Sequence, residues 1–463
     1  MIRSRAAMGT LVAAVLIAAF ALRLAYVESV SYRAVNDAGT YNRLASEIAR
    51  TGDYDVGNGP HTGAGGSHGP TAYFPPGFPY FLSAVDLITG HAAGGKPAIG
   101  PERIAQTVLG TAAVGLIGLV ALEAFGGLTA IVVMVAAAVY PVLIELSGTL
   151  VAENLLIVCE LAATWTMLRA GRSGRPYAWI AASGVLLGLA TLTHENAILW
   201  ILPLGLAAWA AARRHQGHAA RRVGSGRRAL LAPATLAVFT IALISPWTIR
   251  NAIVMHHLIP VSDETGITLV GTYNADAAGF KPVPYKWQYF AHTPQYAAFT
   301  RTATRYSEVG LGHKLESDAL HYIDVHPLAP LSVGAHNALR MFELEGSYAW
   351  HASALAIGLH PGTARVGVAS FWVLCLLAVA GLFTRRARDV PRWLWAIPLL
   401  YALSIVFVNV ETPRFREPID PFLILLAGCA VSAGLERLVG PLGLGGAPVR
   451  RRRRSPQLAR HHL

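Results

Sequence analysis

The sequence predicts an all-α protein that crosses a membrane about ten times, and three observations support this prediction. Hydrophobic residues make up 54% of the 463 residues, charged residues only 14%, and the mean hydropathy is +0.44. Soluble domains usually carry about 25% charged residues. Long apolar runs recur along the chain, and the basic residues collect in the short stretches between them. The pattern is therefore typical of a polytopic membrane protein.

Ten apolar runs are long enough to cross about 30 Å of hydrocarbon as helices. They cover residues 7–27, 103–124, 128–147, 151–170, 177–193, 196–212, 229–248, 365–384, 392–409 and 418–439. The first run follows basic residues, as in a signal peptide, but no small-residue cleavage site comes after it. We therefore expect the first run to be an uncleaved span.

The charge pattern sets the expected orientation. Basic clusters follow the fourth, sixth, eighth and tenth runs, and only the Gly126-Gly127 turn after the second run lacks one. Because cytoplasmic loops carry an excess of Lys and Arg, we expect both termini in the cytoplasm. The net charge of +12 then reflects these clusters and not a nucleic-acid-binding face. Cys159, Cys375 and Cys429 lie within apolar runs and lack the spacing of a disulfide or a metal site.

Two long loops are expected on the outer face, each carrying interfacial helices. The predicted order is a first transmembrane helix (1–27), a first loop (28–101), helices two to seven (102–248), a second loop (249–364), helices eight to ten (365–440) and a basic cytoplasmic tail (441–463). In the first loop, Tyr41, Leu44, Ala45 and Ile48 form one stripe of an amphipathic helix, which suits a helix lying along the membrane surface. Several prolines rule out a single continuous helix through the second loop.

Asp37 opens the amphipathic helix about ten residues after the first span. A carboxylate at this place lies just outside the bilayer, where it could act as a general base over a lipid-borne substrate. The competing interpretation is that Asp37 caps the helix by accepting bonds from the amides of its first turn. The position alone is compatible with both interpretations.

Ionisable residues gather at the outer junctions, while the inner junctions are almost purely basic. Outer-junction residues are Glu145, Glu153, His194, Glu195, Arg250, Asn251, Glu411, Arg414, Arg416, Glu417 and Asp420. Ionisable groups near hydrocarbon are expensive and therefore often functional. Such a surface suits transfer of a sugar from a polyprenyl phosphate, which is already a good leaving group. Arg would stabilise the departing phosphate, and one carboxylate would take the proton of the attacking hydroxyl.

Six short motifs occur in one order along the chain. They are Asp37-Ala38-Gly39-Thr40-Tyr41, Phe74-Pro75-Pro76-Gly77-Phe78-Pro79, Ala152-Glu153-Asn154, Leu192-Thr193-His194-Glu195, the Pro-Trp-x-x-Arg-Asn segment ending at Asn251, and the Arg-Phe-x-x-Pro-x-x-Pro segment starting at Arg414. Together they resemble the polyprenyl-phosphate-sugar-dependent GT-C glycosyltransferases, which include protein O-mannosyltransferases and bacterial aminoarabinose transferases. Two departures stand out, because Asn36 replaces a second acid and His194 replaces a common Arg.

The resemblance implies roles for particular residues. Asp37 would be the catalytic base, and Arg250, Asn251, Arg414 and Arg416 would face the lipid phosphate. The alternative for the arginines is that they anchor span ends at the head groups. Tyr41, Tyr73 and Phe74 are candidates to contact sugar or lipid, although aromatic belts at membrane interfaces are ordinary. Glu153, His194 and Glu195 could bind a divalent metal ion, and a polar turn without metal is the alternative.

The sequence therefore predicts a multi-pass enzyme of the cell membrane with its active site on the outer face. It would transfer a hexosyl or pentosyl group, with inversion, from a polyprenyl-phosphate donor to a protein, lipid or glycan acceptor. Membrane lipids are expected partners and nucleic acid is not, and a divalent metal ion is the only candidate cofactor. The alternative is a transporter or flippase of lipid-linked sugars.

Overall fold

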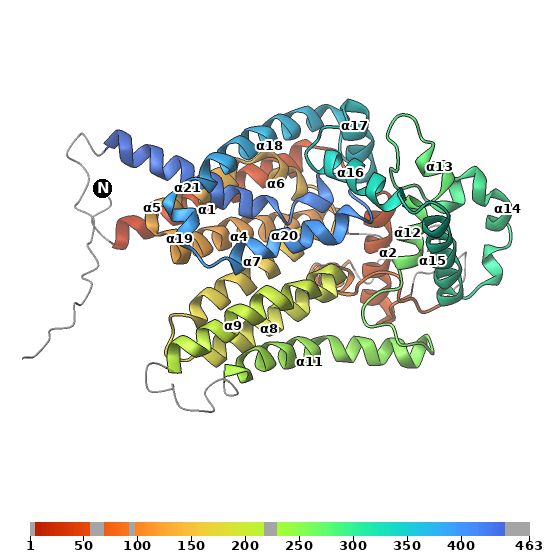
Figure 1. Cartoon of the computed structure of the whole chain (residues 1–463), viewed down its shortest axis with the longest axis horizontal. Coiled ribbons are helices and arrows are strands. Elements are labelled where there is room, and N and C mark those ends of the chain that lie inside the picture. The colour runs from red at the N-terminus through yellow and green to blue at the C-terminus, as the bar shows by residue number, and fades with distance from the viewer. Residues whose placement is uncertain (1–4, 56–68, 92–97, 217–228, 440–463) are drawn as a thin grey trace, which may run out of the picture.

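The computed structural model describes residues 5–55, 69–91, 98–216 and 229–439, and in these residues the fold is helical with no named strand. Long helices lie side by side in a bundle, and α2 (Asn36–Thr51) crosses one end of it (Figure 1). Beyond α2 lie the short helices of the second loop. The predicted class, an all-α polytopic membrane protein, is confirmed.

Helices occur at all ten predicted spans. The elements are α1 (Arg5–Ser29), α4 (Ile99–Phe125), α5 (Gly127–Val139) with α6 (Pro141–Leu146), α7 (Glu153–Ala170), α8 (Pro176–Thr193), η2 (Glu195–Trp200) with α9 (Ile201–Gln216), α11 (Leu231–Val254), α18 (Pro361–Leu382), α20 (Trp393–Val406) and α21 (Asp420–Val439). Among the described residues, seven helices are long and apolar enough to cross a membrane. The shorter apolar helices include α5 and α20.

The third predicted span is not one helix, which corrects the expectation for residues 128–147. Helix α5 ends at Val139, and α6 begins at Pro141. Tyr140 between them is extended, with φ −69° and ψ 115°. A residue before proline is pushed out of the helical region, and proline itself fits the first position of a new helix. The break therefore follows from Pro141.

The first loop packs its two helices against the end of the bundle. Helix α2 buries Tyr41, Leu44, Ala45 and Ile48, so the predicted stripe is its packed face. Its partner α3 (Gly77–Ile88) starts at Gly77, where an added Cβ would lie 2.8 Å from the carbonyl oxygen of Leu192. No side chain fits at this close approach, which holds the start of α3 against the end of α8.

The second loop has a small hydrophobic core of its own. Its elements are α12 (Thr265–Thr272), α13 (Ala275–Ala278), η4 (Phe290–His292), η5 (Pro294–Tyr296), α14 (Ala297–Thr300), η6 (Ala303–Arg305), α15 (Glu308–Val325), α16 (Ala329–Met341) and α17 (Ser347–Ala356). Helices α12 and α15 pack together through residues such as Ile267, Val270, Leu311 and Leu315. As expected, no single helix runs through this loop.

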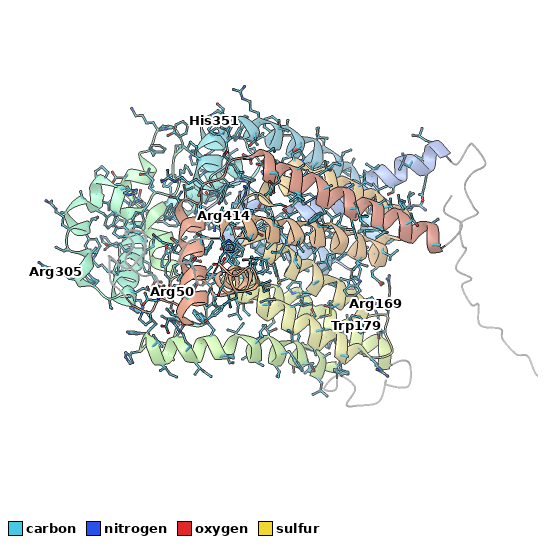
Figure 2. All side chains as sticks on the ribbon, turned by 180° about the vertical axis from the view of Figure 1, so that it is seen from behind. Arg50, Arg169, Trp179, Arg305, His351 and Arg414 are labelled. Atoms are coloured by element: carbon cyan, nitrogen blue, oxygen red, sulfur yellow. The ribbon has the colours of Figure 1, made fainter. Side chains whose placement is uncertain are left out.

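The two ends of the bundle differ in charge. Arg169, near the end of α7, lies far from Arg414 in Figure 2, at the opposite end of the bundle. The short basic helix α19 (Arg385–Asp389) lies at the same end as Arg169. The basic segment at 217–228 and the tail at 441–463 lie outside the described residues. The described basic clusters therefore share the end opposite Arg414.

Candidate functional site

Arg414 joins three parts of the chain that are far apart in sequence. It lies in η7 (Arg414–Arg416), the short turn between α20 and α21, and its side chain is 8% exposed. Its Nη1 donates to Oδ2 of Asp37 at 2.6 Å, and its Nε donates to Oε1 of Glu153 at 2.7 Å. Its Nη2 lies 3.5 Å from the hydroxyl of Tyr41. One guanidinium therefore connects α2, α7 and η7.

Asp37 reaches Arg414 from the first turn of α2. The N-cap of this helix is Val35, and no side chain caps it. The capping interpretation of Asp37 is therefore not what the structure shows, since its carboxylate binds Arg414. Asn36 has φ 49°, and its Nδ2 donates to the carbonyl oxygen of Ala356 at 2.9 Å. The side chain of Asp37 is 40% exposed while that of Glu153 is fully buried, so Asp37 is the carboxylate of this pair that a ligand can reach.

The charges around Arg414 stabilise its cation. Burial alone disfavours the charge, but the carboxylates of Glu153 and Asp37 outweigh it and raise the pKa of Arg414 above its ordinary value. His194 responds in the opposite direction, because burial and then the charge of Arg414 lower its pKa to about 4. The imidazole is therefore neutral near pH 7, and its ring lies against Tyr401 and Phe415. Arg414 is the permanent cation of this site.

Glu264 is a further acidic residue of the site, and it was absent from the sequence predictions. Its pKa is raised well above the ordinary value, first by burial and then by the nearby carboxylates of Glu195 and Asp37. Its neighbour Ser262 donates to Oε2 of Glu195 at 2.6 Å. One signal could have identified it: Asp263-Glu264 is the only pair of adjacent acids in the sequence. Glu264 therefore adds a carboxyl group with a raised pKa to a site that also contains the exposed carboxylate of Asp37.

The predicted aromatic residues pack against one another, and one of them, Tyr41, contacts Arg414. The rings of Tyr41 and Phe74 lie 4.8 Å apart between centroids, and those of Tyr73 and Phe74 lie 4.6 Å apart. Tyr41 and Phe74 are 5% and 4% exposed, so both are packing residues of the first loop. Only the hydroxyl of Tyr41 points at Arg414. Tyr73 is partly buried and contacts the core of the second loop.

Arg250 and Asn251 bind backbone carbonyls of the two loops. Arg250 donates to the carbonyl oxygens of Thr71 at 2.6 Å and Tyr54 at 3.1 Å, and its guanidinium stacks over the ring of Trp247. Asn251 is fully buried and donates to the carbonyl oxygen of Ile259 at 3.1 Å. These contacts fix both loops to the end of α11.

Arg416 lies close to Arg414 in sequence but has different partners. Its Nη1 donates to Oε1 of Glu343 at 2.6 Å, and its Nε lies 3.3 Å from Oδ1 of Asp420. Its guanidinium also lies 3.6 Å from the ring centroid of Phe371. With a side chain only 2% exposed, Arg416 is committed to these protein groups. The structure thus brings Arg414, and not Arg416, to Asp37.

Comparisons with known proteins match this architecture. Residues 74–249 match the family model described as dolichyl-phosphate-mannose-protein mannosyltransferase. The Archaeoglobus fulgidus oligosaccharyltransferase, solved with a tethered acceptor peptide, is similar over 96% of this chain and 51% of that chain, with 15% identity and a TM-score of 0.54. The oligosaccharyltransferase AglB from Archaeoglobus fulgidus, solved with an inhibitory peptide and a dolichol-phosphate, is similar over 95% of this chain and 52% of that chain, with 15% identity and a TM-score of 0.53. The chain has the GT-C fold.

The resemblance to GT-C glycosyltransferases expected from the sequence is therefore confirmed. The chain spans about half the length of the oligosaccharyltransferase structures. A weaker likeness, with 15% identity, coverage of 93% and 79% and a TM-score of 0.37, is to ArnT from Cupriavidus metallidurans bound to undecaprenyl phosphate. No curated protein matches the sequence significantly.

The three candidate metal ligands do not share a centre. Glu153 binds Arg414, Glu195 accepts from Ser262, and the ring of His194 packs against aromatic side chains. Across the part of the chain that the structure describes, no group of three or more His, Cys, Asp or Glu side chains is arranged to hold a metal ion. Glu153 therefore acts as an anchor of Arg414 in this structure.

Proposed function

We propose that the protein is a membrane glycosyltransferase that moves a sugar from a polyprenyl-phosphate donor to an acceptor on the outer face of the cell membrane. The observation that carries this proposal is the bridge from Arg414 to Asp37 and Glu153. It combines a permanent cation, a buried anchor and a reachable carboxylate at one end of the GT-C bundle. The dolichol-phosphate bound by the similar AglB structure supports a lipid-phosphate donor.

Arg414 has donors left for a phosphate. A guanidinium carries five N–H groups, and three are directed at Glu153, Asp37 and Tyr41 among the described residues. The remaining N–H groups would bind oxygens of the donor phosphate. Negative charge grows on the phosphate oxygen as the bond to the sugar breaks, and a fixed cation at that place lowers the barrier.

Asp37 would accept the proton of the attacking group. The acceptor hydroxyl oxygen forms a bond to the anomeric carbon while the bond from that carbon to the phosphate oxygen breaks. The hydroxyl proton passes to Asp37, and polyprenyl phosphate leaves with the bonding electrons. Phosphate bound to the remaining N–H groups would share the charge of Arg414 and so weaken its ion pair with Asp37, which would free the carboxylate for this step. A single in-line displacement inverts the anomeric centre.

The proposed orientation follows from charge. Arg169 lies at the end of the bundle opposite Arg414, and cytoplasmic ends of membrane proteins are the basic ones. With the basic end in the cytoplasm, Asp37, Arg414 and both long loops would lie on the outer side. The acceptor would reach the site from there, and it can be a protein, a lipid or a glycan.

The test compares Asp37→Asn with Asp53→Asn, an exposed acid just beyond the other end of α2. Purified variants in liposomes receive a panel of polyprenyl-phosphate sugars, with and without chelator, and release of polyprenyl phosphate is measured. We expect Asp37→Asn to reduce release by about 10²–10⁴-fold, the usual contribution of a general base, and Asp53→Asn to leave it unchanged. Normal release by a folded Asp37→Asn variant would contradict the proposal. A flippase would instead move the lipid-linked sugar across the bilayer without releasing polyprenyl phosphate.

A further inference from the structure

Helix α16 buries polar residues beside apolar ones and exposes a stripe of apolar residues. Asn337 is fully buried and Arg340 is 3% exposed. The opposite side of the helix carries an exposed stripe formed by Leu328, Leu331, Ala335, Leu339 and Phe342. Leu331 and Leu339 are 66% and 43% exposed. A helix whose outer side faces water exposes polar residues there instead.

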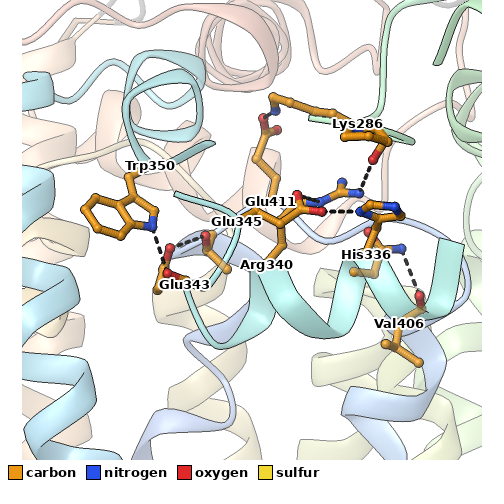
Figure 3. A network of polar contacts seen from close by, with 11 residues as sticks. Lys286, His336, Arg340, Glu343, Glu345, Trp350, Val406 and Glu411 are labelled. Carbon is orange, nitrogen blue, oxygen red and sulfur yellow. Dashed lines mark hydrogen bonds and ion pairs between the residues drawn. The ribbon is translucent and has the colours of Figure 1, made fainter. Parts of the chain in front are cut away.

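Polar residues on the buried side of α16 bind the end of α20 and the second loop (Figure 3). Asn337 Nδ2 donates to the carbonyl oxygen of Val406 at 2.8 Å, at the end of α20. Arg340 forms an ion pair with Glu345 at 2.8 Å and donates to the carbonyl oxygen of Pro284 at 3.0 Å. The polar groups of α16 are therefore used inside the protein and leave the exposed side to apolar residues.

Glu343 extends this contact to the segment that carries Arg414. It follows α16 directly, and its two carboxylate oxygens accept from Arg416 at 2.6 Å and from Thr412 at 3.1 Å. Arg414 lies between these two partners in the chain. Glu343 thus links α16 to the turn that carries Arg414, so that a shift of the helix would move the turn.

The exposed stripe is continuous with the membrane-crossing helix α18. The indole Nε1 of Trp372 donates to the carbonyl oxygen of Phe342 at 2.9 Å, and the rings of Phe342 and Phe371 lie 6.5 Å apart. Helix α18 is one of the candidate spans, and its Leu376 is 73% exposed. The same apolar surface therefore runs from α18 onto α16.

Helix α15, the neighbour of α16 in the chain, shows the opposite pattern. Its exposed residues are mainly polar, namely His313, Ser317, His321 and Asp324. Leu320 is 50% exposed among them, and the other exposed apolar residue is Val325 at the end of the helix. Isolated exposed leucines are ordinary on water-facing surfaces, whereas a continuous apolar stripe marks an interaction surface.

We propose that α16 lies in the hydrocarbon of the bilayer, with lipid acyl chains covering its exposed stripe. Under the orientation proposed above, this is the outer leaflet. The bilayer then holds α16 from outside, while Asn337 binds the end of α20 and Glu343 binds the turn at 412–416 from inside. The lipid is in this sense a structural partner of the turn that presents Arg414.

The test uses the unmodified protein in liposomes of phosphatidylcholine that carries a photoreactive diazirine in its acyl chain. After illumination, labelled residues are mapped by mass spectrometry. We expect Leu331, Leu339 and Phe342 to be labelled at levels similar to Leu376 of α18, while Leu320 of α15 stays unlabelled. A stripe without label beside a labelled Leu376 would overturn the proposal. The same result with cross-linked dimers would show that a second copy covers the stripe.

A matched pair of substitutions gives a second readout. Leu339→Glu places a charge in hydrocarbon under the proposal, whereas Leu320→Glu places it in water. In liposomes we expect the first variant to lower the apparent melting temperature by several degrees and the second to leave it unchanged. Equal shifts would overturn the proposal. Neither readout requires sugar transfer, so a failure of the proposed activity would not affect this test.

Discussion

Replacing Glu153 by Gln tests whether a buried carboxylate anchors Arg414. The side chain of Glu153 is fully buried, and its Oε1 accepts from Nε of Arg414 at 2.7 Å. Its Oε2 has no hydrogen-bond partner among the described residues, so the amide nitrogen of Gln fits in its place. The substitution therefore removes the charge and leaves the shape.

The expected magnitude follows from this geometry. Loss of one partner from a buried pair costs about 3–5 kcal/mol when the other charge is left alone. Arg414 keeps Asp37 in the variant, so the cost falls toward that of one charge-assisted hydrogen bond, about 2–3 kcal/mol. If the lost charge also positions Arg414 in the transition state, transfer slows by about 30- to 150-fold.

Glu160 provides the matched control for this experiment. It lies on the same helix, is 1% exposed, and neither of its carboxylate oxygens has a partner among the described residues. Thermal unfolding in liposomes and release of polyprenyl phosphate are measured for Glu153→Gln and Glu160→Gln. We expect a lower melting temperature and slower release only for the first variant. Equal behaviour of the two variants would refute the anchoring role of Glu153.

Three further predictions concern groups near the site. Arg414→Lys keeps the charge but lacks the planar fork that bridges two carboxylates, so we expect slower transfer. Arg416→Lys should instead lower thermal stability, because the side chain of Arg416 binds protein groups. Arg250→Lys should increase proteolysis of the first loop, since its guanidinium binds two backbone carbonyls there. The pKa of Asp263 is raised to about 7 by burial and then by nearby carboxylates. The native state therefore binds a proton that the unfolded chain releases, so melting temperature should fall as pH rises toward 7, and less so in Asp263→Asn.

Local features of the sequence predicted the helices well, because hydropathy and charge act over short stretches. The break in the third span was missed because hydropathy alone does not register Pro141. It could have been predicted, since the residue before a proline disfavours the helical conformation. The contact between Asp37 and Arg414 could not be read from the sequence, because it depends on how distant helices pack.

The two arginines of η7 illustrate a second limit. Arg414 and Arg416 look equivalent in sequence, but residues two apart in a 3₁₀ turn project to different sides. One therefore meets Asp37, and the other meets Glu343. Glu264 was missed for a different reason, because the adjacent acids Asp263-Glu264 do not by themselves indicate a role, and its importance comes from carboxylates contributed by other segments.

The bridge made by Arg414 has a consequence for dissecting the protein into parts. The stretch that matches the mannosyltransferase family model, residues 74–249, contains Glu153 but neither Asp37 nor Arg414. A fragment restricted to that stretch would bury the carboxylate of Glu153 without its cation and would lack the proposed base. Chimeras and split versions of this chain must therefore exchange the helix that begins at Asn36 and the turn before α21 as a set.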